Sequence, residues 1–159
     1  MIEPERQPAA LAARLDHILA VGARMIALVP GRQRGDGAHD DDHVALDVAY
    51  QMFRQSLAFA DAMDLGRFPA DWRQPTIPRD LQDGGALARY GALVRARLSG
   101  WFEGAAPAEY ARTIETDRGP ERGHALLERT TRDAAQQMLR LRELLADLGV
   151  RPDESSPVR

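Results

Sequence analysis

Hydrophobic residues recur every three or four positions in four stretches of the chain, a spacing that places them on one face of an α-helix. These stretches are residues 9–29, 43–63, 86–102 and 120–149. The stripe of the first consists of Leu11, Leu15, Ile18, Leu19, Met25, Ile26 and Val29. The second carries apolar residues around most of its circumference, which is typical of a central helix. The pattern therefore predicts four long helices.

Local signals set the expected ends of these helices. Pro30 and Gly31 stop the first. Asp42 is a suitable N-cap for the second, because its carboxylate can accept a hydrogen bond from a free backbone N–H. Pro120 is tolerated in the first turn of the fourth helix, and Gly149 suits the position just beyond its end.

Two connections stand out between the predicted helices. Residues 66–85 contain prolines at 69, 75 and 78, which forbid a continuous helix. We expect this segment to cross the domain and to be pinned by Phe68, Trp72, Ile77 and Leu81. Residues 111–116 permit a short extended segment, half of a small hairpin.

Together these elements predict an all-α fold, a four-helix bundle with a long crossover connection between helices 2 and 3. The chain of 159 residues corresponds to one domain, residues 1–150, and we expect residues 151–159 to form a frayed tail.

Composition excludes several classes of function. The absence of cysteine excludes disulfides, thiolate metal sites and cysteine nucleophiles. All 21 basic residues are arginines, dispersed in a chain of net charge −3, so we expect no nucleic-acid partner. A phosphate loop of the Gly-x-x-x-x-Gly-Lys type requires a lysine, and there is none. Neither a secretory signal nor a bilayer-spanning stretch is visible, which predicts a cytoplasmic protein without a membrane partner.

The sequence resembles one known family. Residues 126–150 are similar to the last helix of the DinB-like bundle family, and residues 49–54 with 57–62 are similar to its second helix. Residues 100–102 and the segment to Gly119 fit its third helix and the link that follows. The family includes metal-dependent proteins, thiol transferases and maleylpyruvate isomerases, and its members commonly pair. The resemblance, together with the apolar second helix, implies a homodimer.

The family's metal site implies the candidate site of this chain. Its three histidines, one on the second helix and two at i and i+4 on the last, correspond to Gln51, Asp133 and Gln137. One carboxylate and two amides are poor ligands for zinc-like ions, so we expect no metal and no other cofactor here. The three side chains either hydrogen-bond to one another as an internal staple or form a ligand pocket with Asp133 as acceptor or base.

The histidines have alternative interpretations. The run from His39 to His43 encloses three aspartates, and it forms either a metal-binding loop edge or a solvated lead into a helix. His17 lies at the edge of the first stripe, where it is a boundary residue unless that helix borders the pocket. His124, at the start of the fourth helix, is a surface or packing residue.

The arginines of the fourth helix also allow two interpretations. Arg132, Arg140 and Arg142, with Glu128 and Glu143, are typical of a solvated face. Arg129 and Arg140 would alternatively bind an anionic ligand.

Two functions remain. The first is a small-molecule-binding or stress-associated bundle protein with a degenerate, metal-free site. The second, implied by the resemblance, is a thiol-dependent transferase or isomerase, in which Asp133 acts as a general base and arginines hold an anionic substrate.

Overall fold

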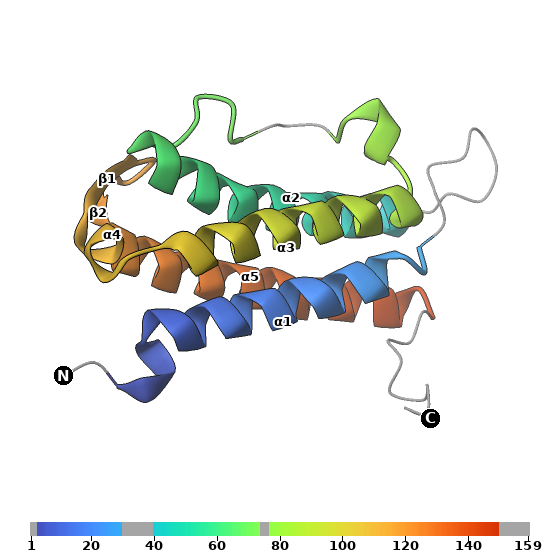
Figure 1. Ribbon diagram of the computed structural model, residues 1–159. Helices are drawn as coiled ribbons and strands as arrows, with labels where there is room; N and C mark the ends of the chain where they lie inside the picture. Colours follow the sequence, from blue (N-terminus) through green and yellow to red (C-terminus); the bar gives the residue numbers. More distant parts are fainter. Residues whose placement is uncertain (1–2, 30–39, 74–76, 150–159) are drawn as a thin grey trace.

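The computed structural model describes residues 3–29, 40–73 and 77–149, and most of these residues are helical (Figure 1). The long helices are α1 (Pro8–Ile26), α2 (Asp40–Leu65), α3 (Gly84–Gly104) and α5 (Gly123–Asp147). The short elements are the 3-10 helices η1 (Pro4–Arg6) and η2 (Arg79–Leu81), α4 (Pro107–Ala111), and the strands β1 (Thr113–Thr116) and β2 (Gly119–Arg122). The all-α class predicted from the sequence is confirmed.

The four long helices lie side by side, and α2 and α3 run in the same direction, opposite to α1 and α5 (Figure 1). Helix α2 packs chiefly on α5 and α3, while α1 packs chiefly on α3 and α5. All seven residues of the predicted α1 stripe are buried. Because α2 and α3 are parallel, the end of α2 and the start of α3 lie at opposite ends of the molecule, and the connection between them runs along its length.

The crossover is pinned to the body of the protein at both of its ends. At its start, Phe68 N–H donates to the carbonyl of Glu115 in β1 over 2.8 Å, and Phe68 and Trp72 are in ring contact at 5.2 Å. Further along, Ile77 is buried, and Leu81 packs on the core. Phe68, Ile77 and Leu81 therefore pack on the core, whereas the ring contact of Trp72 is with Phe68 of the same segment.

Several predicted helix boundaries are wrong. Helix α2 begins at Asp40, so residue 42 lies inside the helix and is not its N-cap. Pro120 lies in β2, where it pairs with Glu115, so α5 begins only at Gly123. The hairpin is complete because β2 finds its partner in β1, and Gly119, at φ +94°, closes the turn. Helix α4 was not predicted.

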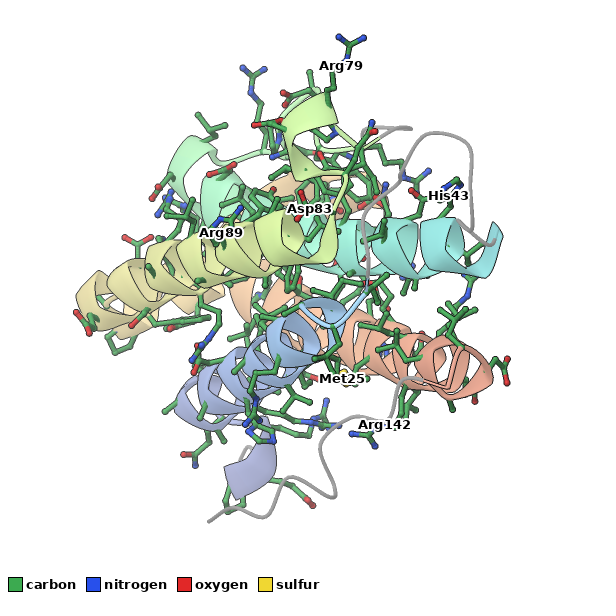
Figure 2. All side chains as sticks on the ribbon, turned by 90° about the vertical axis from the view of Figure 1, so that its right-hand side faces the viewer. Met25, His43, Arg79, Asp83, Arg89 and Arg142 are labelled. Carbon is green, nitrogen blue, oxygen red and sulfur yellow. The ribbon has the colours of Figure 1, made fainter. Side chains whose placement is uncertain are left out.

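Helix α3 begins earlier than predicted, at a well-defined cap. The Asp83 carboxylate accepts a hydrogen bond from Ala86 N–H over 2.7 Å. Figure 2, which looks onto this end of the molecule, shows Asp83 at the start of α3.

In the described ranges, no helix is both long and apolar enough to cross a membrane. The predicted tail, residues 151–159, and Pro30 and Gly31 lie outside the described residues. The cytoplasmic location remains a prediction.

Candidate functional site

Helix α5 positions two of the three predicted site residues. Its buried stripe, which includes Leu126, Leu127, Met138, Leu141 and Leu145, faces the core. Asp133 and Gln137 lie beside this stripe and are half-buried. They are four residues apart, so they lie about one turn apart on the same face of the helix.

The partner of Asp133 on α2 is Gln55. Gln55 Nε2 donates to Asp133 Oδ2 over 2.9 Å, in a partly buried hydrogen bond between helices distant in sequence. The family resemblance predicted that Gln51 would be the residue of this helix at the site. Gln51 precedes Gln55 by one turn on the same face, and because α2 and α5 are antiparallel, position 51 lies in register with position 137. A hydrogen bond therefore joins α2 to α5 at Asp133, but it is not the staple expected between Gln51, Asp133 and Gln137.

Gln137 carries a buried acceptor whose hydrogen bond is missing. Its Oε1 atom is inaccessible to solvent and has no hydrogen-bond partner in the part of the chain that the structure describes. A buried acceptor left without a donor costs about 1–3 kcal/mol. A donor from outside the chain, either water or a ligand, reaches this atom only when the Gln137 side chain turns towards the pocket that the residue lines.

Asp133 and Gln137 line a pocket of about 280 Å³. Its walls come from α2, the crossover, the hairpin turn and α5, and the remaining lining residues are Gln55, Trp72, Arg73, Asp117, Arg118, Arg129 and Gln136. Gln51 is not among them. The crossover and hairpin residues of the pocket could not be predicted from the sequence, because nothing local shows that these segments meet beside α5.

Arg129 forms one wall of the pocket as part of a buried ion-pair cluster. Its side chain donates to Glu121 over 2.6 and 3.2 Å and to Asp117 over 3.0 Å. Its guanidinium lies 5.8 Å from the centre of the Phe68 ring. Arg129 is 7% exposed. Its contacts join α5 to both the hairpin and the start of the crossover.

This cluster contradicts the alternative interpretation of Arg129 as a group that binds an anionic ligand. Its charge is already neutralised by two carboxylates, so it is not a free anion-binding group. Arg140 is exposed and lies 11 residues further along, about 16 Å away along the helix axis, too far to share a small ligand with Arg129.

The cluster also sets the protonation of Glu121. Burial raises the pKa of Glu121, but hydrogen bonds from Arg129 and Thr116, together with the charges of Arg129 and Arg118, outweigh burial. The pKa of Glu121 therefore lies below its ordinary value.

The solvated face predicted on α5 is largely confirmed. Arg132, Arg140, Arg142 and Glu143 are exposed, and Figure 2 shows Arg142 on the outside of the helix. Glu128 differs, because it accepts a hydrogen bond from Arg6 over 2.7 Å and lies 3.3 Å from His124.

The described histidines lie away from the pocket. His17 is exposed. His124 Nε2 lies 2.7 Å from the carbonyl oxygen of Arg6, so it fastens η1 to the start of α5. His43 lies near the start of α2 (Figure 2), 12 residues or about 18 Å before Gln55. His39, the other histidine of the proposed metal-binding loop, lies outside the described residues.

The donor set of the pocket does not fit a transition metal. Across the described ranges, no group of three histidine, cysteine, aspartate or glutamate side chains is close enough to hold an ion. At the predicted site, the only carboxylate, Asp133, is joined by amides, which are weak ligands for zinc-like ions.

A larger groove of about 660 Å³ lies between α1, α3 and α4, far from the predicted site residues. Its lining is mostly apolar and includes Ala12, Leu98, Phe102 and Tyr110. Asp16, at its edge, is paired with Arg95 over 2.9 Å. The groove contains no described polar atom that lacks a hydrogen-bond partner, so the polar pocket is the stronger candidate site.

Comparison with known proteins found no matching family model, no similar curated protein and no similar solved structure. The DinB-like resemblance therefore rests on the residues quoted above and remains a prediction.

Proposed function

We propose that the protein is a DinB-like four-helix bundle that binds a small polar molecule, without a metal, in the pocket between α2 and α5. The observation that carries this proposal is the buried, unpartnered Gln137 Oε1 beside Asp133. A purely structural staple would satisfy its own polar groups, as Gln55 and Asp133 do. The family assignment is supported by the resemblance and by the parallel α2 and α3 with a crossover between them.

The size of the pocket favours binding of a small molecule over a thiol-dependent transferase. Enclosed ligand sites commonly have volumes of about 300–1,000 Å³, so a pocket of about 280 Å³ accommodates only a small ligand. A peptide-sized thiol would extend beyond it. Asp133, the candidate base, already accepts a hydrogen bond from Gln55.

The proposal is tested by thermal shift with three sets of compounds: polar molecules of about ten heavy atoms, low-molecular-weight thiols, and divalent metal ions. We expect at least one polar compound to raise the melting temperature, because a ligand that binds only the native state stabilises it. Gln137→Leu should abolish this shift while leaving the protein folded, since it removes an unsatisfied acceptor. Gln7→Leu, the same change at an exposed position outside the pocket, is the matched control.

Three outcomes would contradict the proposal. A shift produced only by a metal, together with about one equivalent of a transition metal in the untagged protein, would restore the metal centre. A shift produced by thiols and dependent on Asp133 would favour the transferase. Polar compounds whose effect survives Gln137→Leu would place the site elsewhere.

A further inference from the structure

The floor of the pocket presents hydrogen-bond acceptors. Asp133 contributes a carboxylate, of which Oδ2 is bonded to Gln55. One turn further along α5, Gln137 also lines the pocket, and its unpartnered Oε1 lies beneath the pocket surface, where a ligand reaches it only when the side-chain amide turns outward. Two acceptors on one helix face, one of them charged, match a positively charged group with several N–H donors.

The edge of the pocket carries two arginines that form no ion pair with a carboxylate among the described residues. Arg118 lies in the turn between β1 and β2, and Arg73 lies with its guanidinium 4.9 Å from the centre of the Trp72 ring. Over residues 3–29, 40–73 and 77–149, neither forms an ion pair with a carboxylate. Asp117, the nearest carboxylate in sequence to Arg118, is bound to Arg129.

We propose that the ligand is a small zwitterion, a single amino acid bound by its two charged ends; this inference rests on the proposed function. Its ammonium group donates to Asp133 and Gln137 Oε1, and its carboxylate accepts from Arg118 and Arg73. The volume agrees with this assignment, because 280 Å³ corresponds to roughly nine water volumes at about 30 Å³ each. A single amino acid matches this space, whereas a tripeptide does not.

The charges of the pocket disfavour simpler ligands. A metal ion would find two carboxylates, one of them already bonded to Arg129, and three arginines that repel it. A simple anion would pair with the arginines but would meet the Asp133 charge and leave Gln137 Oε1 without a donor. A zwitterion satisfies both ends of the pocket.

The test is a thermal-shift screen of the twenty ordinary amino acids with β-alanine and γ-aminobutyrate, followed by calorimetric titration of the best compound. That compound is then compared with its amide, which lacks the carboxylate, and its N-acetyl form, which lacks the ammonium group. We expect both derivatives to bind about tenfold more weakly or worse, because each loses a charge-assisted contact.

Variants of the full chain test the two ends separately. Asp133→Asn should weaken binding of the amino acid at least about tenfold but affect binding of its N-acetyl form much less. Arg118→Gln should weaken binding of the amino acid but affect binding of its amide much less. Arg132→Gln is the matched control, because Arg132 is adjacent to Asp133 in sequence but exposed and outside the pocket. Its affinity should stay within about twofold of the wild type. The melting temperature without ligand verifies that each variant is folded.

The outcomes separate this inference from the proposed function. The zwitterion proposal is overturned if no amino acid raises the melting temperature of the protein. It is also overturned if the amide or the N-acetyl form binds as well as the parent amino acid. Another polar compound that binds and requires Gln137 would then leave the proposed function intact. If no compound in either screen requires Gln137, both proposals fail.

Discussion

Single residues of this protein differ sharply in how their polar groups are satisfied. Arg129 is buried and bonded to two carboxylates, whereas Gln137, two turns further along α5, has a buried acceptor without a partner. The first arrangement fastens the hairpin to α5. The second leaves the pocket dependent on a donor from outside the protein.

Removing the Arg129 side chain is expected to destabilise the protein strongly. Arg129→Met leaves Glu121 and Asp117 without their cation; breaking a fully buried pair costs about 3–5 kcal/mol, which is the upper limit for these partly buried carboxylates. The matched control is Arg95→Met, which breaks the exposed pair with Asp16 and should cost only about 0–1 kcal/mol. Urea unfolding at pH 7 measures both values. Equal losses would mean that the Arg129 cluster contributes no more than a surface pair.

The same cluster predicts a dependence of stability on pH. Since the pKa of Glu121 is lowered in the folded state, the unfolded chain takes up the proton first as the pH falls. Stability from this group is therefore present above the ordinary glutamate pKa of about 4.3 and is lost as the pH falls through the lowered folded value. Unfolding from pH 7 to 3 should show a smaller acid loss in Glu121→Gln than in the wild type. An unchanged acid loss would contradict the prediction.

The family resemblance predicted Asp133 and Gln137 at the site, but it did not predict Gln55. Gln51 and Gln55 share one face of α2, so the helical period cannot distinguish them. Which of them meets Asp133 depends on how far α2 and α5 are shifted along their axes, and packing between distant segments sets that shift.

At the scale of elements, the start of α3 is fixed by its close approach to the end of α1. A Cβ atom at Gly84 would overlap the backbone carbonyl oxygens of Ile26 and Val29. Glycine is therefore required there so that the two helix ends can touch, while Asp83 caps the first turn.

Two substitutions in α3 test this contact. Gly84→Ala is expected to cost about 1–3 kcal/mol of the free energy of unfolding, as overpacked sites do, because backbone must move to admit the methyl group. Gly100→Ala, at an exposed position where a Cβ meets nothing within 4 Å, should instead stabilise the protein by about 0.5–1 kcal/mol. Chemical denaturation of both variants gives the comparison. A neutral Gly84→Ala would show that the helix ends separate easily.

Hydrophobic period predicted the long helices, but their ends depended on tertiary contacts. Pro120 is compatible with a helix start and with an edge strand, and its pairing with β1 decided for the strand. Helix α4 spans only five residues, too few to produce a readable period.

At the scale of the whole molecule, the structure removes one reason for expecting a homodimer. The apolar residues of α2 that suggested surplus hydrophobic surface, such as Leu46, Tyr50, Phe53 and Phe59, are buried within the chain itself. The expectation then rests on the family resemblance alone.

Light scattering coupled to size-exclusion chromatography tests the homodimer, which remains our prediction. A dimer would elute with twice the chain mass of 17.6 kDa, and a lower loading concentration should shift it toward the monomer if the interface is weak. A single species of chain mass at every concentration would contradict the prediction.

The position of α5 between α1 and α2 has a consequence for synthesis on the ribosome. Helix α5 packs on both of these helices, yet it follows them by more than 50 residues in the chain. At about 5–20 residues per second, their apolar faces stay open to water for several seconds while residues 66–147 are translated. During that interval the nascent polypeptide is exposed to aggregation, so its yield in cells should depend on chaperones that shield those faces.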